Sequence, residues 1–339
     1  MALFLKLNWN LNLRSLPKPM ASVLFAALAA FSLGTTPAVA APADTVMVTE
    51  AFHTLLYLPL YVAKHEGIFE RNGINVPTIR AAGSGPTALT SVMAGEAQFS
   101  VHGPEHVGFA QERGGHAKAV SAVANSAPVW ILSGKDVQVA SAADLKGKRV
   151  VVGMAPGTSN TLLKRWLRSN GMDETKDITM IEVQNGTELG PILAGRADVA
   201  VLYQPQVEQG LSQGLKIDHA FTSDYPQYAF STVNTSQKII DTQPDMVKRF
   251  VKSIDESLIL MRKDPATAKQ VARQEFPGVD GAIVDAAVQR MIEAQVYPVN
   301  TTVTQQAFDS AIDTQKFIGN IKTDMKYTDV VDPDFFAKQ

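Results

Sequence analysis

Three short loops carry residue types suited to holding a small ligand. They are residues 83–87, 103–105 and 157–160, and each lies between a strand-like segment and a helical segment. A helix start presents unpaired N–H groups and a partial positive charge, and glycine lets a ligand approach the backbone. Serine or threonine before a helix also serves as an ordinary cap, so each loop alone is weak evidence. The candidate ligand-binding residues in these loops are Ser84, Gly85, Thr87, Gly103, Glu105, Gly157, Thr158 and Ser159.

Aromatic side chains lie near the same strand ends. A largely apolar pocket with a few polar groups suits a small organic ligand. The candidates are Phe52, Tyr57, Trp130, Tyr203 and Tyr228, with His53 beside the first of them. Packing in a core is the alternative for each aromatic residue, and it applies most strongly to Trp130, which lies inside an apolar run.

The segment His102–His106 suggests a metal site, because two histidines four residues apart can share a helix face. Gly103 and Pro104 place a loop and a helix start between them, so we predict no metal and no cofactor. His102 stays a candidate ligand-binding residue. Glu105 is either an acid stabilised in the first turn of a helix, or it faces the ligand and favours an amine or a ring N–H.

The elements that must position these residues alternate between strand and helix, which implies parallel sheets with crossover helices. The pattern restarts at the apolar run Arg149–Gly153, and residues 83–101 are similar to residues 185–201. Two equivalent lobes explain this internal similarity, although a repeated helix-glycine-strand order also arises by chance. Near the end of the chain, apolar residues over Asp245–Arg262 have helical spacing, and Pro265 follows.

The first 40 residues have the order of a secretory signal peptide. A basic segment without acids precedes the apolar run Ala21–Leu33, and Ala38–Ala40 forms an A-x-A cleavage site. The run of 13 residues is too short to span a bilayer as a helix, although an uncleaved anchor is the alternative. No cysteine follows the run. We therefore predict cleavage near Ala40 and a periplasmic protein.

Composition narrows the remaining classes. Three of the 31 basic residues and none of the 33 acidic residues lie in the first 40, which leaves 28 against 33 and a net charge of −5. A mildly acidic chain argues against nucleic acid or an anionic membrane as a partner. Without cysteine the sequence has no disulfide and no thiolate nucleophile. The sequence also lacks the motifs of hydrolytic and nucleotide-binding sites. We expect the protein to be a monomer.

Four segments together resemble the nitrate/sulfonate/taurine-type solute-binding proteins of bacterial ABC importers, in the superfamily that includes thiamine-pyrimidine binders. The segments are residues 58–76, 81–101, 144–160 and 193–211. The resemblance implies a type II periplasmic-binding-protein fold, with two α/β lobes joined by crossover strands at Val129–Gly134 and Tyr228–Asn234. The lobes are then residues 44–133 with 232–339, and residues 134–231.

The resemblance also implies the function. A small molecule, of the sulfonate, carboxylate or nitrogen-heterocycle class, binds between the lobes, closes them and passes to a membrane permease. One alternative is an enzyme like the thiamine-pyrimidine synthase of the same superfamily, which uses a cysteine-rich motif; this chain has no cysteine and carries an export signal. Another is a periplasmic partner that presents its ligand to a sensory receptor.

Overall fold

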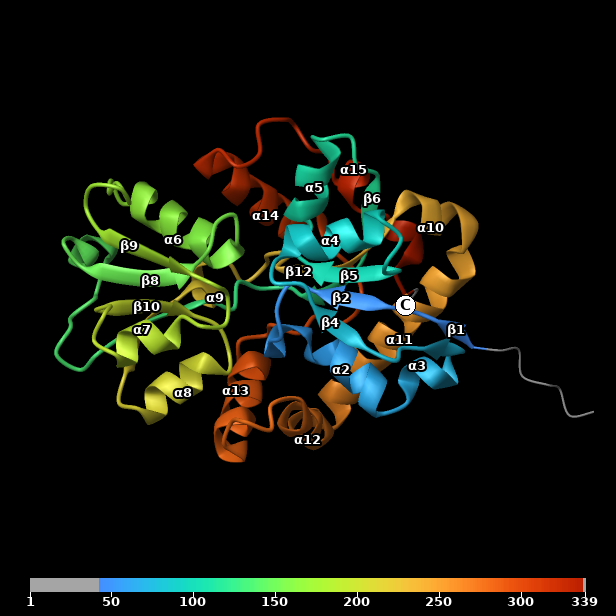
Figure 1. Ribbon diagram of the computed structural model, residues 1–339, viewed down its shortest axis with the longest axis horizontal. Coiled ribbons are helices and arrows are strands. Elements are labelled where there is room, and N and C mark those ends of the chain that lie inside the picture. The colour runs from blue at the N-terminus through green and yellow to red at the C-terminus, as the bar shows by residue number, and fades with distance from the viewer. Residues whose placement is uncertain (1–42, 338–339) are drawn as a thin grey trace, which may run out of the picture. The chain divides into compact units, whose positions relative to one another are not determined.

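Two five-stranded mixed sheets organise the protein, in a computed structural model that describes residues 43–337 (Figure 1). The predicted signal peptide, residues 1–40, lies outside these residues. Among the helices of residues 43–337, none is long and apolar enough to cross a membrane. We call the first sheet with its helices the first lobe, and the second sheet with its helices the second lobe.

The first sheet has the order β4 (Ile79–Ala81), β2 (Val48–Glu50), β5 (Phe99–His102), β12 (Ser231–Ser236) and β6 (Ala117–Ala124). Strand β2 pairs in parallel with β4 and β5, whereas β12 is antiparallel to β5 and β6. Helix α4 (Gly85–Met93) packs on β2 and β5, and α5 (Glu105–Gln111) packs on β6. The carboxyl ends of β4 and β5 therefore lead into α4 and α5.

The second sheet has the order β9 (Thr179–Val183), β8 (Arg149–Gly153), β10 (Val199–Leu202), β7 (Trp130–Ser133) and β11 (Lys216–Ala220). Strand β8 is parallel to β9 and β10, and β7 is antiparallel to β10 and β11. Helix α6 (Thr158–Ser169) packs on β8, α7 (Leu189–Leu193) on β10 and α8 (Gln206–Ser212) on β11.

The two sheets have the same strand order. In each, the first parallel strand lies between the second and the third, and an antiparallel strand separates the third from the last. The two similar stretches of sequence fall on equivalent elements, α4 with β5 and α7 with β10. This equivalence favours two related lobes over a chance recurrence of the pattern.

The antiparallel strands lie where the chain passes between the two sheets: β7 follows β6 of the first sheet, and β12 follows β11 of the second. Strand β7 pairs within the second sheet, and β12 pairs within the first. The predicted division into 44–133 with 232–339 and 134–231 stays a prediction. Because Trp130–Ser133 pair with β10 and β11, their pairing favours a boundary before residue 130.

Local chemistry explains two differences from the expected elements. Residues 58–72 have the apolar spacing of one helix, but they form two, α2 (Leu58–His65) and α3 (Ile68–Arg71), because Gly67 between them has a left-handed φ of 63°. Residues 75–80 have a strand-like pattern, but they are divided between β3 (Ile74–Asn75) and β4, since Pro77 lacks the N–H that a sheet ladder needs. Strand β3 pairs with β1 (Asp44–Thr45).

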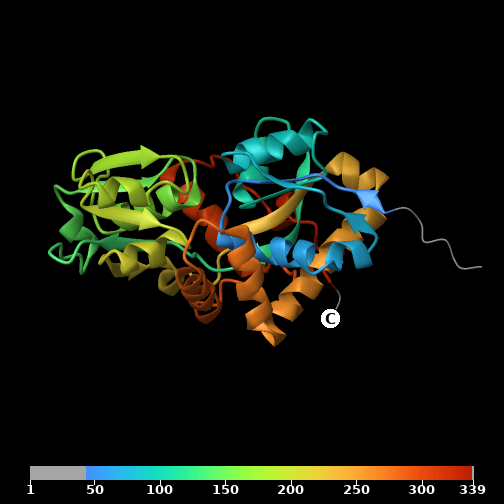
Figure 2. The same cartoon turned by 60° about the horizontal axis from the view of Figure 1, so that its bottom comes forward.

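Helix α11 (Pro244–Lys263) matches its expected range closely and buries its apolar stripe. Phe250 of this helix stacks on Phe99 of β5 at 4.0 Å and on Phe69 of α3 at 4.9 Å. The C-terminal helices α13 (Gly281–Glu293) and α14 (Gln305–Ile318) contact α8 and α6 of the second lobe (Figures 1 and 2). Arg290 and Glu208 form an ion pair in the first of these contacts.

The other described elements are short or lie at the surface of the lobes. They are η1 (Leu55–Tyr57), η2 (Ala142–Leu145), α9 (Phe221–Asp224), α10 (Gln237–Thr242), α12 (Pro265–Glu275), α15 (Tyr327–Val330) and η3 (Pro333–Phe335).

Candidate functional site

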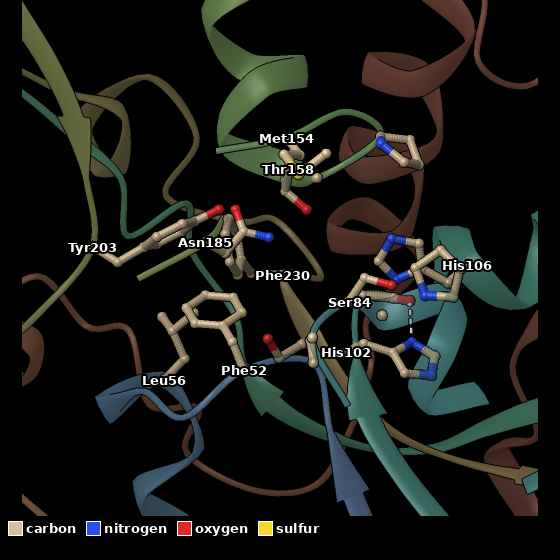
Figure 3. Close-up of a pocket in the computed structure, with 18 of the residues that line it drawn as sticks. Phe52, Leu56, Ser84, His102, His106, Met154, Thr158, Asn185, Tyr203 and Phe230 are labelled. Carbon is tan, nitrogen blue, oxygen red and sulfur yellow. Dashed lines mark hydrogen bonds between the residues drawn. The ribbon is translucent and has the colours of Figure 1, made fainter. Parts of the chain in front are cut away.

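A cavity of about 320 Å³ lies where the carboxyl ends of strands from both sheets meet (Figure 3). The first sheet contributes the segments that follow β2, β4 and β5, and the second contributes those that follow β8, β9 and β10. Ligands of open α/β sheets bind at this edge, and the cavity volume is at the lower end of the range of ligand pockets, about 300–1,000 Å³. The cavity is therefore the candidate binding site.

Nine of the residues expected from the sequence line this cavity. They are Phe52, Tyr57, Ser84, Gly85, His102, Gly103, Gly157, Thr158 and Tyr203. They come from both lobes, so the structure brings together loops that are far apart in the sequence. Their role in binding a ligand stays a prediction.

Six expected residues do not line the cavity, and most have a structural role instead. His53 turns to Glu50, with Nδ1 at 3.0 Å from the carboxylate. Thr87 is exposed and donates its N–H to the Ser84 hydroxyl, which caps α4. Trp130 and Tyr228 are buried in the hydrophobic core. The remaining two, Glu105 and Ser159, are buried behind the cavity wall.

Several lining residues were missed by the sequence analysis. They are Ala51, Leu56, Gly83, Pro86, His106, Met154, Ala155, Pro156, Gln184, Asn185, Phe230 and Ser231. Gln184 and Asn185 directly follow β9, so the strand-end argument would have found them if it had been applied to that strand. His106 was considered only as a metal ligand. No feature of the sequence indicates that His106, rather than its neighbour Glu105 on α5, lines the cavity.

One side of the cavity is aromatic. The ring of Phe52 lies 5.3 Å from that of Tyr203, and Tyr203 lies 6.0 Å from Phe230. The phenol oxygen of Tyr203 accepts a 3.0 Å hydrogen bond from the backbone N–H of Ser159. Burial raises the pKa of Tyr203, so its phenol keeps its proton. This side therefore offers flat apolar surface and one O–H donor.

Three glycines make room for polar side chains around the cavity. A Cβ on Gly85 would overlap the Nδ1 of His106, one on Gly103 would overlap the carboxyl of Glu105, and one on Gly153 would overlap the Oδ1 of Asn185. Figure 3 shows His106 beside Ser84, and Asn185 between Tyr203 and Thr158. These glycines thus position groups that no larger residue would admit.

Several polar atoms in and behind the walls of the cavity lack hydrogen-bond partners. Buried atoms without a hydrogen bond include Oε2 of Glu105, both ring nitrogens of His106, the Ser159 hydroxyl and Oδ1 of Asn185. Buried polar atoms in proteins are nearly always paired, so such a cluster beside a cavity is consistent with pairing to a ligand.

Burial also controls the charge of the site. It lowers the pKa of His106 well below its usual value and the pKa of His102 to about 4, so both imidazoles are neutral at neutral pH. It raises the pKa of the Glu105 carboxyl to about 7 and that of Glu188 to about 7. None of the described residues that line the cavity is lysine or arginine. The lining therefore carries no fixed positive charge.

The histidines do not form a metal site in the described part of the chain. The rings of His102 and His106 are 5.1 Å apart, and His102 bonds through Nδ1 to the carbonyl of Gly103. Within residues 43–337, no three histidine, aspartate or glutamate side chains gather in an arrangement that could hold a metal ion.

Comparison with known proteins finds a matching family model and a distant relative that binds a small molecule. A family model described as NMT1/THI5 like matches residues 56–268. The riboflavin-binding protein RibY of Chloroflexus aurantiacus is 24% identical over 284 residues, which cover 78% of this chain and 78% of RibY.

Two solved structures share the fold. The aliphatic sulphonate-binding protein SsuA of Escherichia coli has a TM-score of 0.68 at 17% identity, covering 82% of this chain and 87% of SsuA. The nitrate-binding protein NrtA of Synechocystis PCC 6803 has a TM-score of 0.64 at 15% identity, covering 78% and 75%. Both are periplasmic binding proteins, which confirms the fold class expected from the sequence.

Proposed function

The chain belongs to the NMT1/THI5-like family, and we propose that it is the periplasmic solute-binding protein of an ABC importer. It captures one small organic molecule by closing its two lobes and delivers that molecule to a permease in the inner membrane. The observation that carries this proposal is the cavity, because its walls come from strand ends of both sheets.

The mechanism of ligand capture follows from the fact that both lobes contribute to the walls of the cavity. A ligand in the cavity contacts both lobes at once, so it stabilises the arrangement in which the lobes lie together. Contacts that form only on closure are the usual basis of hinged capture. Capture and release require no covalent step. The enzyme alternative would need the cysteine-rich motif of the synthase, and the sequence has no cysteine.

The relatives support a small-molecule ligand but differ in which one they bind. The ligands in the names of these relatives are riboflavin, aliphatic sulphonates and nitrate, which include a ring compound and anions. The aromatic side of the cavity, with Phe52, Tyr203 and Phe230, favours an organic molecule with a flat part over a small inorganic ion. Among the expected classes, we favour the nitrogen heterocycles.

Native mass spectrometry tests this function directly. The protein, purified from cells without denaturation and then incubated with an extract of small molecules, should retain one low-molecular-weight compound. A tight ligand should also raise the melting temperature by mass action, by an amount that grows with ligand concentration. A protein that retains no small molecule from any extract would argue against the proposal.

Export is tested separately. N-terminal sequencing of the protein recovered from the periplasm should give a chain that begins near Ala41. Recovery of the intact chain in the membrane fraction would contradict a cleaved signal peptide and would leave the binding function standing.

A further inference from the structure

We propose, on the basis of the function proposed above, that Glu105 acts as a built-in anion at the start of α6. The site therefore selects uncharged or cationic hydrogen-bond donors and rejects sulfonates, carboxylates and nitrate.

The N-terminus of α6 is the place in this cavity where an anion would bind. A helix start offers unpaired N–H groups and a partial positive charge, and α6 is 12 residues long. In this protein a carboxyl group of the first lobe already lies beside this terminus. The hydroxyl of Thr158, the first residue of α6, donates to Oε1 of Glu105 at 2.9 Å. The backbone N–H of Ser159, the second residue of α6, donates to the Tyr203 phenol at 3.0 Å.

The second oxygen of this carboxyl is free. Glu105 is fully buried, and its Oε2 has no hydrogen-bond partner. The carboxyl lies directly over the α-carbon of Gly103, a residue that lines the cavity, in the space that a Cβ there would fill. A ligand donor that reaches past Gly103 therefore meets an unsatisfied acceptor, whereas a ligand anion meets a like charge at any pH above about 7, where Glu105 is ionised.

The groups that face Glu105 provide no compensating cation. His106, on the same helix, has Nε2 at 3.9 Å from Oε1, and burial keeps its imidazole neutral. His102 on β5 is neutral for the same reason. The neighbouring phenols are protonated, because burial raises the pKa of each; they belong to Tyr57, Tyr203 and Tyr228. Repulsion between two like charges is strong in such a buried site, because the effective dielectric constant is low.

Two of the unpaired atoms around the cavity are hydrogen-bond acceptors, which a ligand with N–H donors satisfies. Oε2 of Glu105 in the first lobe and Oδ1 of Asn185 in the second are both acceptors without a partner. His106, being neutral, offers one ring N–H and one acceptor nitrogen. A ligand with two or more N–H groups satisfies both lobes, and its flat face packs against Phe52 and Tyr203. Amide, amidine and aminated-ring edges have this chemistry.

A matched series of benzene derivatives tests the inference without knowledge of the natural ligand. Benzamidine, benzamide, benzoate and benzenesulfonate share a ring and differ in charge and donors. Calorimetry at about pH 8, where Glu105 is ionised, should show the amidine and the amide binding at least about tenfold more tightly than either anion. In Glu105→Gln this ratio should fall about tenfold. Glu96→Gln, which changes an exposed carboxylate, should leave it unaltered.

The unmodified protein gives a second measurement that does not depend on how a variant folds. The pKa of Glu105 is raised to about 7 by burial, so its charge is largely lost by about pH 5.5. The anions should then bind more tightly than at pH 8, and the preference for benzamide over benzoate should narrow.

Three results would overturn the inference. They are tighter binding of benzoate or benzenesulfonate than of benzamide at pH 8, a ratio that is the same at both pH values, or no binding of the amide and amidine at about 10 mM. Retention of a sulfonate or carboxylate from an extract would defeat this inference and leave the solute-binding function intact. Retention of no small molecule at all would instead defeat the function itself.

Discussion

The hydroxyl of Thr158 donates a 2.9 Å hydrogen bond to the carboxyl of Glu105, and the two residues start helices of different lobes. Glu105 begins α5 after β5 of the first sheet, and Thr158 begins α6 after β8 of the second. The bond therefore exists only when the two walls of the cavity lie together. It connects the closed arrangement of the lobes to the same residues that shape the candidate binding site.

Loss of this bond should destabilise the protein. Thr158→Val keeps the shape of the side chain but leaves both oxygens of the buried Glu105 without a side-chain partner. An unsatisfied buried group costs about 1–3 kcal/mol, and urea denaturation should show a loss of that size. Thr90→Val is the matched control, because Thr90 is exposed and bonds only within its own helix. Equal losses in the two variants would contradict a cross-lobe role.

The raised pKa of Glu105 should appear in the pH dependence of stability. Its folded pKa of about 7 is above the ordinary value of 4.5, so the folded state binds more protons between these values. Stability from this group is full below about pH 4.5 and is lost as pH rises through 7, by up to roughly 3 kcal/mol. Glu105→Gln removes the titration.

The difference in unfolding free energy between the unmodified protein and Glu105→Gln isolates this group. Other titrations, such as that of Glu188, occur in both proteins and cancel. The stability of the variant relative to the unmodified protein should rise from about pH 5 to pH 8 and then level off. A difference that is independent of pH would show that the carboxyl titrates normally.

The space above Gly85 should be intolerant of a side chain. Gly85→Ala places a Cβ where the Nδ1 of His106 lies, so the imidazole or α4 must move. Overpacking of this kind typically costs about 1–3 kcal/mol, and benzamide affinity should fall with it. Gly190→Ala on α7 is the control, since nothing lies within 4 Å of its Cβ. Alanine there should be neutral or stabilising, because it favours a helix.

The aromatic wall should matter more for binding than for stability. Phe52 is only partly buried and contacts Tyr203 at 5.3 Å between ring centroids. Phe52→Ala should weaken benzamide binding about tenfold, because the loss of ring surface and an aromatic contact amounts to about 1–2 kcal/mol. Phe317→Ala, at an exposed position away from the cavity, should not change the affinity. Similar affinities for both variants would remove Phe52 from the proposed site.

Residue patterns along the chain were enough to predict several of the elements and the loops between them. The apolar run Arg149–Gly153 predicted β8 with its observed ends, and helical spacing predicted α11, because these patterns follow from burial of a whole strand or of one helix face. Since ligands bind at the carboxyl ends of strands, the sequence also predicted the loops at Ser84, Gly103 and Thr158, and these residues line the cavity. The four similar segments indicated the family and the fold, which the comparisons confirm.

Which side chains of those loops reach the cavity depends on how the helices pack in three dimensions. Glu105 and His106 are neighbours on α5, and successive residues of a helix point about 100° apart, so the rotation of the helix determines which one lines the cavity. That rotation is set by packing against distant parts of the chain. The bond between Glu105 and Thr158 likewise joins residues 53 positions apart, and no local pattern encodes such a contact.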